Sequence, residues 1–292
     1  MRVAVLGAGQ MGHGIAQVSA QADHDVVLRD VEESIVDAGI ESIAENLQGA
    51  VDRDLLSSDE REATLGRIDG TTDLSAAVTD ADLVIEAVPE DLDLKTEVFG
   101  SVDGLAPDDA ILASNTSSLP VSEIANALDR PDRFVGLHFF NPVHLMDLVE
   151  IVRAEQTSDA TASFAVDFVE DIGKEPIVVA DSAGFATSRL GVITGLEAIR
   201  MVEAGVASPP DIDAGMVVGY NYPIGPLELT DVVGLDVRLD VAEHLRSELG
   251  ERFRPPQLLR RKVRAGKLGK KTGEGFYVWE DGERVGPSGD WD

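Results

Sequence analysis

The chain has 292 residues, enough for two domains, and 43% of them are hydrophobic, as is usual for a globular protein. It carries 54 acidic residues against 24 lysines and arginines, and the resulting formal charge of −30 excludes nucleic acid and anionic membranes as natural partners. The absence of cysteine excludes disulfides, thiolate metal sites and cysteine nucleophiles, and we expect no metal centre.

Composition also bears on where the protein works. No apolar run approaches the roughly 18 residues of a membrane span, and the N-terminus lacks the long apolar region and cleavage site of a signal peptide. We therefore expect a cytoplasmic protein without a membrane partner. The acid excess favours a halophilic cytoplasm, because in molar salt the Debye length shrinks to about 3 Å and acid–acid repulsion is screened.

A nucleotide-binding pattern opens the chain. Residues 2–6 form an apolar run typical of a buried strand, and G-x-G-x-x-G follows at once, before a helical pattern. A second strand pattern, 25–29, leads into Asp30, where this motif places the acid that binds a ribose 2′-hydroxyl. Asp30 repels a 2′-phosphate, so NAD is favoured, although Arg29 keeps NADP open as an alternative. The loop residues are Gly7, Gly9, Gln10, Met11 and Gly12.

Helical and strand patterns continue the same architecture. Residues 32–66 read as helical, with Asn46 and Arg53 seven apart and hence on one side of a helix. Residues 83–88 read as a buried strand, followed by a helix that carries Lys95. The strand 110–113 ends in the small polar residues 114–118, which at the carboxyl end of a parallel strand face the ligand crevice. Capping of the next helix is the alternative role for part of this run.

A histidine and a glutamate stand out in the middle of the chain. His138 ends the apolar strand 135–137, the pair Asn141-Pro142 predicts a turn, and Glu150 lies inside the apolar strand 148–152. Joined by one turn, the two side chains can meet as a general base oriented by an acid. On these residues alone, a packed histidine and an edge-strand glutamate form an equal alternative.

Strand patterns stop after residues 177–180. Helical patterns then cover 184–204, 210–218, 227–249 and 257–265. We therefore predict a Rossmann-type α/β dinucleotide-binding domain over residues 1–182, an all-α substrate and dimerisation domain over 183–280, and a loose tail over 281–292. The second domain has too few helices to bury their apolar faces, which predicts a homodimer through this domain.

One segment runs against the acidic background. Between Arg252 and Lys271 there are nine cations and no acid. These cations either pair with acids elsewhere on the surface or form an anion site for the phosphates of a cofactor or substrate. Lys271 stands in a glycine-containing loop and is a candidate for such a contact.

Six motifs together resemble the 3-hydroxyacyl-CoA dehydrogenase family, and most closely its stand-alone 3-hydroxybutyryl-CoA dehydrogenases. The resemblance runs in order from Arg2 to Tyr277, and several of the motifs are long and specific. They are G-A-G-x-M-G-x-G-I-A-Q, A-S-N-T-S-S-L, G-L-H-F-F-N-P, L-V-E-I, G-P-L-E-L and K-K-T-G-E-G-F-Y.

The resemblance implies reversible oxidation of an (S)-3-hydroxyacyl-CoA to the 3-ketoacyl-CoA with NAD, in fatty acid β-oxidation. It makes His138 the catalytic base, Glu150 its paired carboxylate and Ser117 the serine that hydrogen-bonds the reacting oxygen. The residues it places at the cofactor are Asp30, Glu90, Lys95, Ser117 and Asn141 with the glycine loop, and the cationic segment adds Lys271 as a candidate. Those it places at the CoA substrate are Asn46, Arg53, Ser117 and Asn141.

One position departs from the family pattern. Where the family reads G-F-x-x-N-R, this chain has Ser188 in place of an asparagine counted with the catalytic group. Two alternatives stay open. In the first, the chain is a related NAD-dependent dehydrogenase that acts on a sugar acid or another small hydroxy acid. In the second, which Ser188 suggests, it is a catalytically weak NAD-binding relative. The retained His138, Glu150 and Ser117 favour the 3-hydroxyacyl-CoA dehydrogenase.

Overall fold

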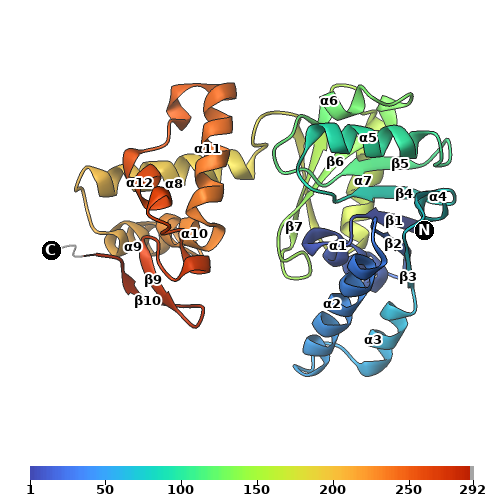
Figure 1. Cartoon of the computed structure of the whole chain (residues 1–292), viewed down its shortest axis with the longest axis horizontal. Coiled ribbons are helices and arrows are strands. Elements are labelled where there is room, and N and C mark those ends of the chain that lie inside the picture. Colours follow the sequence, from blue (N-terminus) through green and yellow to red (C-terminus); the bar gives the residue numbers. More distant parts are fainter. Residues whose placement is uncertain (290–292) are drawn as a thin grey trace. The chain divides into compact units, whose positions relative to one another are not determined.

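The computed structural model describes residues 1–289 and divides the chain into two compact units, Met1–Phe185 and Ala186–Asp292 (Figure 1). The sequence analysis placed this boundary after residue 182.

The first unit is an α/β domain built on an eight-stranded sheet. Its strands are β1 (Arg2–Leu6), β2 (Asp25–Arg29), β3 (Ile68–Thr71), β4 (Leu83–Glu86), β5 (Ile111–Ser114), β6 (Phe134–Phe139), β7 (Leu148–Arg153) and β8 (Glu175–Ala180). Its helices are α1 (Gln10–Gln21), α2 (Glu33–Val51), α3 (Ser58–Leu65), α4 (Leu74–Val78), α5 (Leu92–Asp103), α6 (Val121–Ala125), η1 (Pro131–Arg133) and α7 (Asp159–Asp171).

The strand order is β3-β2-β1-β4-β5-β6-β7-β8. Every neighbouring pair is parallel except β6 and β7, which are antiparallel. The chain order reverses between β1 and β4, and in open α/β sheets a ligand crevice lies at the carboxyl ends of the strands beside such a reversal. The predicted Rossmann-type domain is confirmed.

Helices cover both faces of this sheet (Figure 1). Alternate residues of β1 point to opposite faces, so that Val3 and Val5 belong to one core and Ala4 and Leu6 to the other. Helices α1, α2 and α7 pack on the first core, and α4, α5 and α6 on the second. Burial on both faces explains why these strands read as continuous apolar runs.

The segment expected to be helical over residues 32–66 is in fact interrupted. Helix α2 ends at Val51, and α3 begins after a capping box in which Glu60 N–H donates to Ser57 Oγ while Ser57 N–H donates to Glu60 Oε2. Strand β3, which follows, was not predicted, because its sequence I-D-G-T carries little apolar pattern.

The second unit is mainly helical, as expected, but not entirely so. Its elements are α8 (Thr187–Glu203), α9 (Pro209–Tyr220), α10 (Pro226–Val233), α11 (Leu235–Leu249), η2 (Glu251–Phe253), α12 (Gln257–Arg264), η3 (Lys270–Thr272), β9 (Tyr277–Glu280) and β10 (Glu283–Pro287). The expected helix 227–249 is two helices, because Gly234 between them has a φ of 103° that breaks the helical path.

A hairpin corrects two further expectations. Strands β9 and β10 pair antiparallel, so the second unit is not all-α. Because β10 extends to Pro287, this part of the expected loose tail is an ordered strand. Residues 290–292 of the expected tail lie outside the described residues. The hairpin is anchored by the buried carboxylate of Asp231, which accepts hydrogen bonds from the backbone N–H groups of Phe276 and Tyr277 and from the indole of Trp279.

Candidate active site

The glycine loop between β1 and α1 has the form of a phosphate cradle. Gly7 has a φ of 103°, and a Cβ at Gly12 would lie 1.7 Å from the Gly7 carbonyl oxygen, so both positions require glycine. A Cβ at Gly9 would meet no atom of residues 1–289 within 4 Å, and no side chain in that range caps the N-terminus of α1 there. The first amides of α1 therefore face open space, as a bound diphosphate requires.

Asp30 is held beside this loop. Its Oδ2 accepts a hydrogen bond of 2.8 Å from the Ala8 amide, and its Oδ1 accepts one of 2.7 Å from the Val31 amide. The Arg29 side chain donates to the carbonyl of Thr72 instead of facing the loop as a free cation. A carboxylate at this position suits a ribose hydroxyl and repels a 2′-phosphate, so the loop fits NAD.

A buried ion pair, which the sequence analysis missed, lies at the end of β4. Glu86 and Lys95 are both fully buried, with Lys95 Nζ 2.6 Å from Glu86 Oε1, and Ser114 Oγ donates to Glu86 Oε2. Burial raises the pKa of Glu86, although Lys95 and Ser114 oppose the shift. Lys95 was expected to contact the cofactor, and this stays a prediction; in the structure its ammonium group is enclosed. It supports the neighbouring carboxylates.

Glu90 connects the buried pair of Glu86 and Lys95 to the loop after β5. Its Oε2 lies 3.4 Å from Lys95 Nζ, while its Oε1 accepts hydrogen bonds from the Thr116 hydroxyl at 2.7 Å and the Ser117 amide at 2.9 Å. The hydroxyl of Ser117 also donates to Glu90, at 3.2 Å. Burial by itself would raise the pKa of Glu90, but the hydrogen bonds and the charge of Lys95 outweigh it and lower the pKa. Glu90 therefore fixes Ser117 in place.

His138 and Glu150 face each other across the antiparallel pair of β6 and β7. They are register partners, and His138 Nδ1 lies 2.8 Å from Glu150 Oε2, with the glutamate fully buried and the histidine 7% exposed. The sequence analysis placed His138 at the end of its strand. In the structure it lies inside β6, which continues to Phe139. Phe140 and Phe185 pack around the imidazole, with ring centroids at 4.5 and 5.7 Å. If the carboxylate accepts the proton of Nδ1, the imidazole lone pair lies on Nε2.

A cavity of about 390 Å³ collects these groups within the first unit. Five residues predicted from the sequence line it, namely Met11, Glu90, Ser117, His138 and Asn141. Met11 comes from the first turn of α1, so the cavity adjoins the glycine loop. Asn115, which belongs to the run 114–118 expected to face the ligand crevice, also lines the cavity, and its Oδ1 accepts a hydrogen bond of 2.9 Å from the Phe139 amide.

Asn46 and Arg53 do not line this cavity. Asn46 lies on α2 and donates from Nδ2 to Gln17 Oε1 at 3.2 Å. Arg53 follows the end of α2, is exposed, and donates from Nε to the Gly49 carbonyl at 2.7 Å. They belong to a neighbouring surface formed by α1 and α2.

Two predicted site residues belong to the second unit. Ser188 is the second residue of α8. Lys271 lies in η3, and its Nζ is 2.6 Å from Asp236 Oδ1, so its charge is already paired. The cofactor contact expected of Lys271 stays a prediction.

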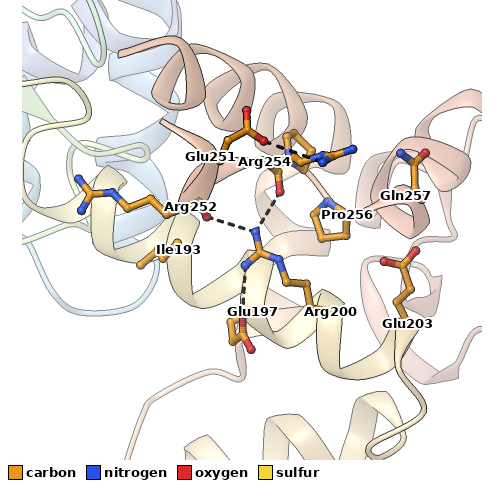
Figure 2. Close-up of a pocket in the computed structure, with 10 residues that line it drawn as sticks. Ile193, Glu197, Arg200, Glu203, Glu251, Arg252, Arg254, Pro256 and Gln257 are labelled. Atoms are coloured by element: carbon orange, nitrogen blue, oxygen red, sulfur yellow. Dashed lines mark hydrogen bonds and ion pairs between the residues drawn. The ribbon is translucent and has the colours of Figure 1, made fainter. Parts of the chain in front are cut away.

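Several cations of the segment 252–271 are paired in the same way. Arg260 pairs with Glu243, and Lys267 with Glu274. Figure 2 shows a cavity of about 600 Å³ in which Arg200 donates to the carbonyls of Arg252 and Arg254. Three glutamates line this cavity with the arginines: Glu197, Glu203 and Glu251. These pairings favour a cationic surface balanced by acids over a dedicated anion site.

The glycine loop, the acid after β2 and the adjoining histidine–glutamate pair define a nucleotide-dependent oxidoreductase. Comparisons with known proteins agree. The model of the 3-hydroxyacyl-CoA dehydrogenase NAD-binding domain matches residues 2–182, and that of the C-terminal domain matches residues 184–279. The chain belongs to the 3-hydroxyacyl-CoA dehydrogenase family and is an NAD-dependent oxidoreductase.

Individual relatives match over nearly their whole length. The probable 3-hydroxybutyryl-CoA dehydrogenase of Deinococcus radiodurans is 45% identical over 280 residues, which cover 96% of this chain and 100% of the relative. The mitochondrial hydroxyacyl-coenzyme A dehydrogenase of Sus scrofa is 43% identical over 285 residues, covering 95% and 91%. The crystal structure of (S)-3-hydroxybutyryl-CoA dehydrogenase from Ralstonia eutropha superposes with a TM-score of 0.92 at 41% identity, covering 96% and 99%.

Within residues 1–289, no group of three or more histidine, aspartate and glutamate side chains is placed to hold a metal ion. In the same range, no helix combines the length and apolarity that crossing a membrane requires.

The position of Asp30 predicts the cofactor preference. NADH should give a higher kcat/KM than NADPH, because with NADPH the Asp30 carboxylate would face the 2′-phosphate. The substitution Asp30→Ala should reduce that preference. Initial rates with both cofactors test this. Equal kcat/KM for the two cofactors in the wild-type enzyme would contradict the reading of Asp30.

Proposed function

We propose that the chain reversibly oxidises (S)-3-hydroxybutyryl-CoA to the 3-ketoacyl-CoA, with His138 as general base and Glu150 as its partner. The observation that carries this proposal is the 2.8 Å contact of His138 Nδ1 with Glu150, at a cavity that Ser117 and Asn141 also line. The substrate is supported by the names of the relatives from Deinococcus radiodurans and Ralstonia eutropha.

In the oxidation, His138 Nε2 removes the proton of the substrate C3 hydroxyl. The charge that develops on the imidazole is stabilised by Glu150, which also keeps the ring in the tautomer with its lone pair on Nε2. Bound NAD supplies the acceptor for the hydride that leaves C3. In the reverse direction the imidazolium returns its proton to the carbonyl oxygen.

Ser117 stabilises the reacting oxygen, where alkoxide character develops in the transition state. Its amide and hydroxyl both donate to Glu90 in the free enzyme, so the hydroxyl must turn towards the substrate when the substrate binds. Asn141 supports the substrate and the nicotinamide from the same cavity. Asn46 and Arg53 contact the CoA moiety, for which the exposed guanidinium of Arg53 provides a positive charge.

A dehydrogenase of a sugar acid or another small hydroxy acid is the alternative enzyme, and a catalytically weak NAD-binding relative is the alternative outside catalysis. A screen with NADH separates them. The proposal requires rapid reduction of acetoacetyl-CoA and little activity on the free keto acid. Activity on free acids alone would favour the first alternative, and NADH binding without turnover would favour the second.

We also propose that the enzyme is a cytoplasmic homodimer, joined through the second unit. Large apolar side chains are exposed on α8 and α9 of the single chain, with Leu190 at 66%, Val218 at 84% and Tyr220 at 75%. A second copy would remove such surface from water. A sedimentation mass of one chain at micromolar concentration would refute this.

The surface charge supports adaptation to a saline cytoplasm. The net charge of −30 should make the midpoint of thermal unfolding rise as potassium chloride increases from dilute to molar, because screening relieves repulsion between acids. Unfolding followed by circular dichroism over this range measures the effect. A midpoint that does not respond to salt would show that the acidic surface has no such role.

Replacement of the base should separate chemistry from binding. His138→Gln should lower kcat by about 10²–10⁴, the usual contribution of general acid–base catalysis, while NADH affinity stays near that of the wild type. Single-turnover reduction of acetoacetyl-CoA and NADH fluorescence titration measure the two effects. A mutant with more than about a tenth of the wild-type rate of chemistry would exclude His138 as the base.

Ser188 should have a smaller effect. Serine keeps a donor and an acceptor but is shorter than the family asparagine, and an ordered water can bridge the difference at little cost. Ser188→Ala should therefore reduce kcat/KM by less than about tenfold, well below the full loss of a charge-assisted hydrogen bond. Ser188→Asn should be neutral or modestly improving with C4 substrates. Selective loss of activity on C10 substrates in Ser188→Asn would show instead that serine widens the acyl pocket.

A further inference from the structure

A compact group of cations lies on the first unit beside the cavity, although the chain as a whole is strongly acidic. It consists of His13 on α1, Arg53 after α2, His144 between β6 and β7, and Lys174 between α7 and β8, and is called here the histidine face. Neither histidine has a part in the chemistry proposed above.

A close contact brings together the two segments that carry the histidines. A Cβ at Gly14 would lie 2.8 Å from Val143 Cβ, so the segment between β6 and β7 rests directly on the first turns of α1. His13 and His144 are the chain neighbours of these two residues. Lys174 holds the segment in place, since its Nζ donates to the carbonyls of Val143 and Met146, both at 2.7 Å.

The same surface continues onto α2. Gln17 follows His13 by four residues and so lies on the same side of α1. Its side chain accepts the hydrogen bond from Asn46, and Asn46 and Arg53 are one seven-residue repeat apart. The histidine face therefore adjoins the two residues proposed to contact CoA.

The electrostatics of the face suit an anion. Burial lowers the pKa of His144, and the charged groups of residues 1–289 that shift it further, namely His13, Lys174 and Arg53, are all cationic. The pKa of His13 is also lowered by burial, against an opposing hydrogen bond with the Gly9 backbone. Burial lowers the pKa of Lys174, and the charge of Asp147 opposes this shift. An anion placed here would interact favourably with the charges of Arg53 and Lys174 and would favour the protonated form of both histidines.

We propose that His13 and His144, with Arg53, bind a phosphate group of the CoA moiety and take up a proton when they do so. This inference rests on the proposed CoA substrate. The ligand chemistry is a phosphate ester or diphosphate, and NAD is the other possible source of it. CoA is favoured because the face extends to Asn46 and Arg53, whereas the dinucleotide loop presents its own amides at the start of α1.

The sign of the pH effect follows from the two lowered pKa values. Both imidazoles favour the neutral form more than an ordinary histidine does, since burial lowers the pKa of His13 and of His144. A bound phosphate stabilises the imidazolium form and raises these pKa values, and each unit of increase corresponds to up to about tenfold in affinity at low pH. CoA should therefore bind about three- to tenfold more tightly at pH 6.5 than at pH 8.

Calorimetric titration of the full-length enzyme with CoA tests this at pH 6.5 and 8 and at fixed potassium chloride. Two buffers of different ionisation enthalpy at each pH give the number of protons taken up. The wild type should take up protons and bind CoA more tightly at pH 6.5. His13→Gln and His144→Gln should each weaken this pH dependence, and the double variant should abolish it. His244→Gln, on α11 of the second unit, is the matched control and should behave as the wild type.

Two further probes identify the group that is bound. Pantetheine, which lacks phosphate, should bind with no pH dependence in any variant, and the NADH affinity should be the same in the double variant as in the wild type. A double variant that keeps the wild-type pH dependence for CoA would overturn the proposal. A double variant with weaker binding of NADH and unchanged binding of CoA would also overturn the proposal.

Failure of the wider function would appear differently. If the wild-type enzyme did not reduce acetoacetyl-CoA, the proposed substrate would be wrong. If it did so while proton uptake on CoA binding was unaffected by the histidine substitutions, only the role of the histidine face would be wrong.

Discussion

The antiparallel pairing of β6 with β7 is the constraint on which the site depends. Every other neighbouring pair in the eight-stranded sheet is parallel. Parallel strands need long crossovers, whereas an antiparallel pair can be closed by a short connection. The pairing therefore places His138 directly opposite Glu150, and it also brings the segment that carries Asn141 and His144 back over α1. One change of strand direction thus positions both the proposed base and the loop beside it.

A second set of buried charges supports the other side of the cavity. Glu86 and Lys95 are fully enclosed, and each makes further hydrogen bonds, to Ser114 and to the carbonyl of Val88. Burying an ion pair is unfavourable unless its remaining donors and acceptors are satisfied, which is the case here. Glu90 then links this pair to Ser117. Glu90, which lines the cavity together with Ser117, is thus supported by the Glu86–Lys95 pair, which does not line it.

The sequence predicted the features that depend on local pattern. The alternation of strands and helices, the family and the NAD cofactor are confirmed, because they rest on motifs whose residues lie close together in the chain. The contacts of the glycine loop and Asp30 with the cofactor stay predictions. The break at Gly234 and the hairpin after residue 276 were missed, since both depend on tertiary contacts such as those of Asp231. Glu86 carried a signal that was passed over, an acid within an apolar strand, which is the same pattern that singled out Glu150. The approach of the segments that carry His13 and His144 has no sequence signal, because it follows from the packing of Gly14 against Val143.

Burial of the Glu86–Lys95 pair has a consequence for an enzyme whose surface is so highly charged. Mobile ions weaken interactions between exposed charges, but they cannot enter the space between two side chains that have no solvent contact. The interaction between Glu86 and Lys95 is therefore insulated from the ionic composition of the medium, while Arg53 and the acidic exterior are not. Changes in the ionic environment should affect substrate capture at the surface and leave the electrostatics of this buried pair largely unaltered.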